Sequence, residues 1–141
     1  MFNFFNANRK KQFLSIWKPV LLKAKTQIFH KNELPEISKK DIWFLIEEWN
    51  QLYEQSNEEE KTGLSVLAYQ LEIHRYAAAM LIDGKSNIQI SGIVLLGYMG
   101  DESAWPLLKS LMKKTESGIS QAARLAMQRI NEGRAKVEIN N

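Results

Sequence analysis

The stretch GYMGDESAWPLLK, residues 97–109, decides between a reactive loop and a corner that joins two packed helices. Its acid pair and hydroxyl follow two glycines, an arrangement that either structure could use. Helix packing and capping explain the stretch better: the glycines allow close packing and end a helix, with Gly100 suited to the left-handed position. Ser103 or Asp101 suits the next N-cap. Pro106 then falls in the first helical turn, where its missing amide proton is not needed. The stretch therefore predicts a helix, a corner and a second helix.

No set of side chains in the sequence forms a recognisable catalytic site. A serine nucleophile needs a base within hydrogen-bond reach, and nothing ties His30 or His74, the two histidines, to Ser103. Glu47 and Glu48 are consecutive, so on a helix their side chains point about 100° apart and do not converge as paired carboxylates. We therefore expect no enzymatic activity, no metal site and no bound cofactor.

Apolar residues recur every three or four positions along the rest of the chain, which predicts an all-α fold. We place the helices at residues 8–30, 39–54, 58–71, 74–83, 86–99, 104–114 and 118–131. Ser38 and Asn57 are the expected N-caps of the second and third helices, and Pro19 should kink or split the first. Residues 1–131 are interpreted as a single helical-repeat domain, and residues 132–141, which lack a periodic apolar face, as a frayed tail.

Length and composition fit one ordinary globular domain, since 45% of the 141 residues are hydrophobic and 25% are charged. The absence of cysteine excludes disulfides and cysteine-ligated metal sites. No apolar run approaches the roughly 20 residues that span a bilayer, and the N-terminus lacks the features of a signal peptide. We therefore expect a soluble, cytoplasmic protein.

The C-terminal part contains an internal repeat of residue class. The helices that begin at Ile88 and Ile119 are offset by 31 residues, and in that alignment small residues match small ones and large match large, as Leu96 matches Met127. Two short antiparallel helices per unit, repeated along the chain, are the plan of helical-repeat proteins.

The stretch ISGIVLLGYMGDESAWPLLKSLMKKTESGISQAARLAMQRI, residues 90–130, resembles bacterial HEAT-like repeats of the short type also found in phycobilin lyases. The matching residues are Leu95-Leu96-Gly97, the Gly100-Asp101 corner, residues 104–111, Ala122-Ala123-Arg124 and Ile130. This resemblance implies a right-handed α-α superhelix of stacked helical hairpins, with a HEAT-like unit at about 86–131.

A second resemblance is to bacterial HEAT-repeat proteins that carry an N-terminal membrane anchor and accompany envelope glycosyltransferases. It is spread over IWKPVLLKA (16–24), LPEISKKDIWFLIEEWNQL (34–52) and GYMGDESAWPLL (97–108). The resemblance implies an anchor ahead of Met1, with Arg9, Lys10 and Lys11 beside the membrane. Basic residues in that position favour the cytoplasmic side, so we expect association with the inner face of the membrane.

Charge is unevenly distributed along the chain. Residues 1–31 hold seven Lys or Arg and no acid, whereas residues 33–60 hold nine acids against two lysines. Oppositely charged helices that pack together would produce this pattern, and so would a surface for an anionic membrane or a phosphate backbone. The candidates for such a surface are Arg9, Lys10, Lys11, Lys18, Lys23 and Lys25.

The tryptophans separate into two pairs. Trp17 and Trp49 fall on apolar stripes and are expected in the core, whereas Trp43 and Trp105 lie off their stripes and are the candidates for contact with a partner. The predicted function is therefore a non-enzymatic scaffold that binds another protein, with a membrane-associated glycosyltransferase as the partner that the resemblance implies. The alternative is a nucleic-acid-binding protein similar to HEAT-like DNA glycosylases, which would need basic residues along its concave face.

Overall fold

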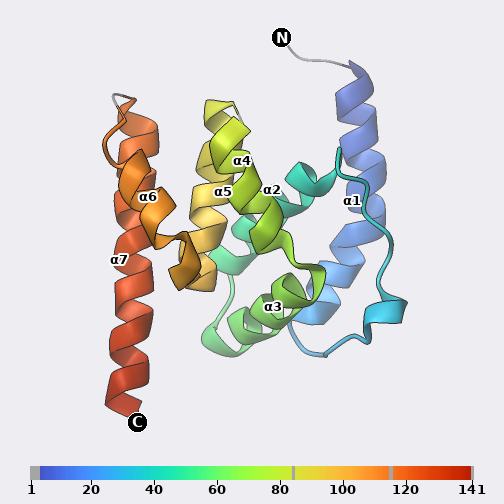
Figure 1. The fold of residues 1–141 in the computed structure, drawn as a ribbon. Coiled ribbons are helices and arrows are strands. Elements are labelled where there is room, and N and C mark those ends of the chain that lie inside the picture. Colours follow the sequence, from blue (N-terminus) through green and yellow to red (C-terminus); the bar gives the residue numbers. More distant parts are fainter. Residues whose placement is uncertain (1–3, 84, 115, 141) are drawn as a thin grey trace. The chain divides into compact units, whose positions relative to one another are not determined.

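The computed structural model describes residues 4–83, 85–114 and 116–140, with side chains over 7–82, 85–114 and 116–135. Within these residues every regular element is a helix, so the predicted all-α fold is confirmed (Figure 1). The chain divides into two compact units, Met1–Ile73 and His74–Asn141, and each is described by itself. The single domain over residues 1–131 stays a prediction.

Three α-helices and a short 3-10 helix make up the described part of the first unit: α1 (Phe4–Ala24), η1 (Lys31–Glu33), α2 (Ile42–Glu54) and α3 (Glu58–Leu71). Each of the three α-helices contacts the other two. Trp17 and Trp49 are buried as predicted, and the indole Nε1 of Trp49 donates a hydrogen bond to the carbonyl of Leu64 at 2.9 Å. The polar atom of this core tryptophan is thereby satisfied. The other buried apolar side chains include Phe13, Leu21, Ala24, Ile42, Phe44, Leu45, Ile46, Leu67 and Ala68.

The starts of α2 and α3 are built differently. Asn57 caps α3 as predicted: its Oδ1 accepts a hydrogen bond from the Glu60 amide at 2.8 Å, while Glu60 Oε1 accepts one from the Asn57 amide at 3.0 Å. The prediction that Ser38 caps α2 is wrong. That helix begins after Asp41, whose carboxylate binds Arg9 of α1 instead of capping the helix. A contact between helices therefore replaces the local cap.

The helix α1 runs through Pro19 without being split there, and it ends earlier than predicted, at Ala24. The chain that follows is held by α3, since Gln70 Nε2 donates a hydrogen bond to the carbonyl of Phe29 at 2.7 Å. The end of α1 also lies directly against α3, where a Cβ on Gly63 would collide with the carbonyl of Ala24. Residues 25–30, which the apolar pattern assigned to the first helix, therefore lie outside it and contact α3 instead.

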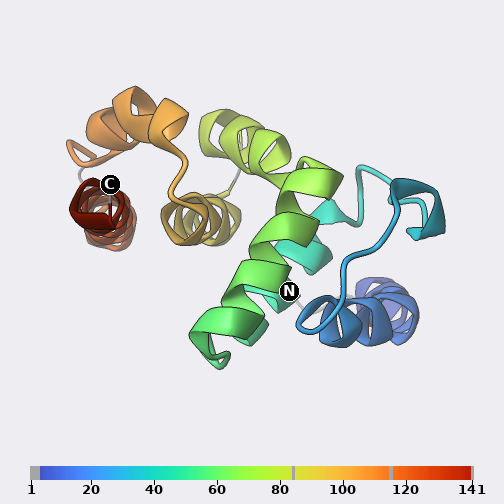
Figure 2. The same ribbon diagram turned by 90° about the horizontal axis from the view of Figure 1, so that it is seen from below.

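Four α-helices make up the described part of the second unit: α4 (Ile73–Asp83), which begins at the last residue of the first unit, α5 (Ser86–Met99), α6 (Trp105–Leu111) and α7 (Ser117–Asn140). A 3-10 turn, η2 (Glu102–Ala104), precedes α6. Within the unit, α4 and α6 form one layer and α5 and α7 the other (Figure 2). The long helix α7 packs on both α5 and α6. Six residues of this helix were predicted to face inward, and Ala122 is only partly buried. The other five are buried: Ile119, Ala123, Ala126, Met127 and Ile130.

The helix α7 continues to Asn140, although the apolar pattern predicted its end near residue 131. Arg134 forms an ion pair with Glu102 at 3.1 Å, which ties this part of the helix to the turn before α6. The backbone of residues 132–140 is therefore helical, and residue 141 lies outside the described residues. Fraying of this segment stays a prediction.

Candidate functional site

The corner that follows α5 is built from helix caps. Gly100 has a φ of 65° and ends α5 in the left-handed conformation, as predicted. Asp101 Oδ1 accepts hydrogen bonds from the amide of Ser103 at 3.1 Å and from its hydroxyl at 2.6 Å. Of the two residues proposed as the cap, Asp101 is therefore the one that acts, and Pro106 lies in the first turn of α6. The hydroxyl of Ser103 helps to hold the turn.

Trp105 begins α6 and borders an open depression between α6 and α7. Its side chain is partly buried, so it packs within the unit and also lines the depression. The volume of the depression is about 490 Å³. The lining residues are Trp105, Met112, Arg124, Met127, Gln128, Asn131, Glu132 and Ala135. Apolar side chains bordered by polar ones are the usual composition of a protein-binding surface.

The α7 side of this depression was missed from the sequence. Arg124, Gln128, Asn131 and Ala135 follow one another at spacings of four, three and four residues, so they form one helical stripe. This stripe lies roughly 125° around α7 from the buried one. The sequence carries a signal for this stripe, because these residues recur at helical spacing on one face of a predicted helix.

Trp43, the other candidate for partner contact, lies differently. Its ring is partly buried and packs against Phe44, with ring centroids 5.2 Å apart. Its indole Nε1 is buried and has no hydrogen-bond acceptor within the described residues. The polar end of Trp43 is therefore turned into the protein, whereas a recognition tryptophan usually presents that end to its partner. Trp105 is the better placed of the two.

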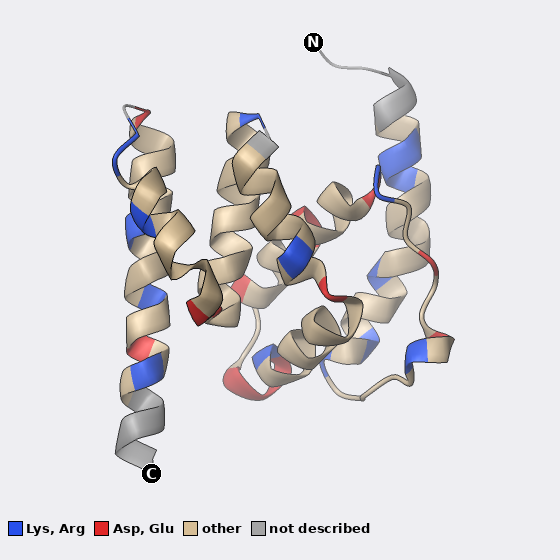
Figure 3. Cartoon of the chain, viewed as in Figure 1, with Lys and Arg blue, Asp and Glu red and all other residues tan. Residues whose placement is uncertain are grey.

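Ion pairs join the basic helix α1 to acids at the start and on the body of α2. Figure 3 shows where the basic and acidic positions lie along these elements. Oppositely charged segments thus lie together within the first unit, which is one of the two explanations that the sequence left open. The pairs are Arg9 with Asp41 at 2.6 Å, Lys10 with Glu47 at 3.1 Å and Lys18 with Glu48 at 3.8 Å.

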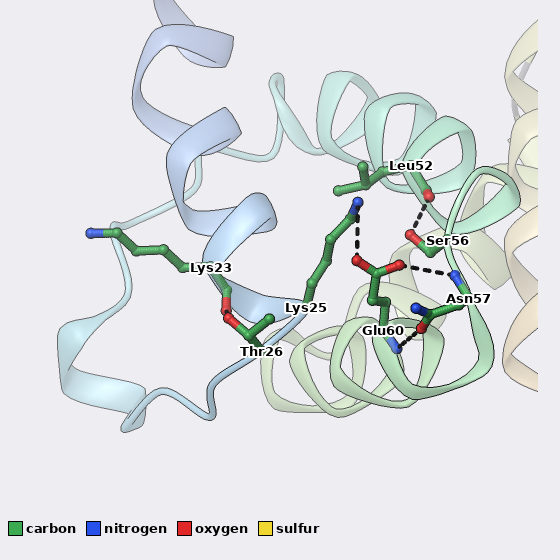
Figure 4. A network of polar contacts seen from close by, with 7 residues as sticks. All are labelled: Lys23, Lys25, Thr26, Leu52, Ser56, Asn57 and Glu60. Atoms are coloured by element: carbon green, nitrogen blue, oxygen red, sulfur yellow. Dashed lines mark hydrogen bonds and ion pairs between the residues drawn. The ribbon is translucent and has the colours of Figure 1, made fainter.

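Lys25 reaches a fourth acid, on α3. Its Nζ lies 3.7 Å from Glu60 Oε2, and the same carboxylate closes the capping box with Asn57 (Figure 4). Lys23 points away from this cluster (Figure 4). Neither Lys23 nor Lys11 forms an ion pair within the described residues. Four of the six candidates for an anionic surface therefore have an acidic neighbour in their own unit.

The carboxylates of the first unit do not gather into one site. Glu47 and Glu48 bind lysines two turns apart on α1, so their side chains diverge as expected. In the part of the chain that the structure describes, no group of three or more His, Cys, Asp or Glu side chains could hold a metal ion. None of the described helices has both the length and the apolar character to cross a bilayer.

Comparison of the chain with protein-family models, with curated proteins and with solved structures found no match. The resemblance to HEAT-like repeats therefore rests on the residues between 90 and 130, and the resemblance to glycosyltransferase-associated proteins on the three stretches quoted for it. Both stay predictions, and the surface described above provides the means to test what they imply.

Proposed function

We propose that this protein is a non-enzymatic scaffold whose α6–α7 surface binds another protein. The observation that carries the proposal is the position of Trp105, a partly buried indole that lines an open depression. A tryptophan in such a position contributes strongly to binding because it buries a large area at a low cost in conformational entropy. Polar side chains on α7, from Arg124 to Glu132, surround the apolar ones.

A right-handed superhelix of HEAT-like hairpins is the fold that we propose for the scaffold. The close approach of helices within the second unit supports it. A Cβ on Gly92 of α5 would lie 3.1 Å from the carbonyl oxygen of Ala77 in α4, and one on Gly97 would lie 2.8 Å from Ala126 Cα in α7. Small residues at such contacts allow short helices to stack closely, and stacked hairpins present extended binding surfaces. The fold does not by itself specify the partner.

The partner class that we propose is a membrane-associated glycosyltransferase, with the scaffold at the inner face of the membrane. This part of the proposal is supported by the resemblance of residues 16–24, 34–52 and 97–108 to proteins that accompany such enzymes.

Nucleic-acid binding was the alternative, and the charges of the first unit do not favour it. A phosphate backbone is attracted by bases that are not already neutralised, and four of the six candidate bases have acidic neighbours. Binding of duplex DNA whose affinity falls steeply with added salt would be the evidence for this alternative.

A photo-crosslinking amino acid at position 128, on the α7 side of the depression, tests the proposed function. Crosslinking in native membranes should trap one partner, which mass spectrometry would identify. Placing the same amino acid at Gln121, an exposed residue of α7 outside the depression, provides the matched control. A partner trapped equally well from both positions would contradict docking at the depression.

The Trp105→Ala variant then measures how much the indole contributes to binding of the purified partner. We expect the free energy of binding to weaken by about 2 kcal/mol, which is roughly a thirtyfold rise in Kd. Leu125→Ala is the control, because Leu125 is an exposed apolar residue of α7 that does not line the depression. An unchanged Kd for a folded Trp105→Ala protein would overturn the proposed function.

A further inference from the structure

The depression at Trp105 is a shallow groove lined by residues from α6 and its end and from α7. On α7 its lining runs from Arg124 to Ala135, which is about 16 Å at 1.5 Å per residue. On α6 and its end, Trp105 and Met112 are seven residues apart and so lie on one face. The groove therefore has a helix on each side, and two of its apolar side chains lie two turns apart.

Two contacts between α7 and the residues before and after α6 show which part of α7 lies beside each end of the groove. Ser120 Oγ donates a hydrogen bond to the carbonyl of Met112 at 3.0 Å, and Arg134 pairs with Glu102, three residues before Trp105. The start of α7 thus lies beside Met112, and its later turns lie beside Trp105. Arg124 consequently belongs to the Met112 end, and Glu132 to the Trp105 end.

The two ends carry opposite charges. The Arg124 side chain is exposed and forms no ion pair within the described residues. Glu132 is exposed too, and its carboxylate accepts a hydrogen bond from Gln128 Nε2 at 3.2 Å. A ligand that fits the groove should therefore present an acid near Arg124 and a base near Glu132, because rim charges of this kind select orientation and partner.

We infer that the groove binds an amphipathic α-helix of the partner protein, with two apolar residues two turns apart, an acid at the Met112 end and a base at the Trp105 end. A helix presents apolar residues at the spacing of Trp105 and Met112, and an amphipathic helix is a recurring ligand of apolar grooves. This inference rests on the proposed function and specifies the chemistry of the binding segment.

A displayed library of 18-residue peptides tests the inference with the full-length protein. Selection on the wild-type chain, with removal of peptides that also bind Trp105→Ala, should enrich sequences with apolar residues seven apart and charges of opposite sign at the two ends. Circular dichroism of the synthesised peptides should show helix formation on binding. Sedimentation of the free protein should give a monomer, since a dimer held through Trp105 would make a second copy the occupant and overturn the inference.

Charge reversal supplies the decisive control. Arg124→Glu should weaken the selected peptides about fivefold, and exchange of the peptide acid for lysine should restore the affinity. Lys109→Glu makes the same charge change on α6 outside the groove and should leave the affinity unchanged. Two results would overturn the helix inference and leave the proposed function standing. One is a Trp105-dependent peptide that binds in an extended conformation, and the other is a peptide whose affinity is unchanged by Arg124→Glu. If no Trp105-dependent peptide is enriched, the inference fails, and the crosslink at position 128 then decides the proposed function separately.

Discussion

At Gly97 the backbones of α5 and α7 lie so close together that no side chain fits between them. A Cβ on Gly97 would lie 2.8 Å from Ala126 Cα and 2.9 Å from Ala126 Cβ. These atoms are fixed by the backbone, so they cannot move aside as the end of a flexible side chain would. Gly133, farther along α7, has nothing within 4 Å of such a Cβ. The same added methyl group should therefore have opposite effects at the two glycines.

We predict that Gly97→Ala lowers the free energy of unfolding by about 1–3 kcal/mol, because the strain of overpacking exceeds the gain in helix propensity. Gly133→Ala should raise it by about 0.5–1 kcal/mol, since only the gain in propensity remains. Urea denaturation followed by circular dichroism measures both. Stabilisation by both substitutions would show that α5 and α7 are not in close contact at Gly97.

The starts of α2 and α3 differ in how well the local sequence predicts them. The segment from Asn57 to Glu60 contains all the groups of its own capping box, so α3 begins where the local sequence specifies. The start of α2 does not follow its local signal, because Asp41 is engaged by Arg9, 32 residues away in the sequence. A cap predicted from consecutive residues therefore also depends on the partners that those residues find elsewhere in the fold.

We predict that Asn57→Ala lowers the free energy of unfolding by about 1 kcal/mol, because the Glu60 amide loses its acceptor. Asn32→Ala serves as the control. Asn32 is exposed, and its side chain makes no hydrogen bond within the described residues, so the change should stay within about 0.5 kcal/mol. Thermal or urea unfolding compares the two variants. An equal decrease in the free energy of unfolding would show that the Asn57 cap does not stabilise the protein more than an exposed asparagine does.

The net charge of the whole molecule, +3, conceals a strong segregation of charge along the chain. In the folded first unit the segregation is largely cancelled, since bases of α1 lie beside acids of α2 and α3. Neighbouring carboxylates reduce the positive potential that α1 would otherwise present to an anionic surface. The attraction of four of the six candidate bases to such a surface therefore depends on their acidic neighbours.

We predict that replacing Glu47 and Glu48 with glutamine strengthens binding to phosphatidylglycerol vesicles several-fold, because Lys10 and Lys18 lose their acidic neighbours. The double variant Glu36→Gln, Glu54→Gln changes the net charge equally but removes no acid that is ion-paired with α1. It should bind as weakly as the wild-type chain in a vesicle co-sedimentation assay. An equal gain in both double variants would mean that only net charge matters.

By itself, the sequence determined the class of fold, most of the helices and the core tryptophans Trp17 and Trp49. Apolar periodicity, the Asn57 cap and the left-handed Gly100 are local signals, and a helix is stabilised by neighbours three or four residues apart. The tertiary structure alone decided that Asp41 binds Arg9, that the bases of α1 lie beside acids, and that Trp105 borders a groove with Arg124 and Glu132. These outcomes depend on which faces of distant helices meet. The interactions of a polar side chain are set by its neighbours in space, which the local sequence does not specify.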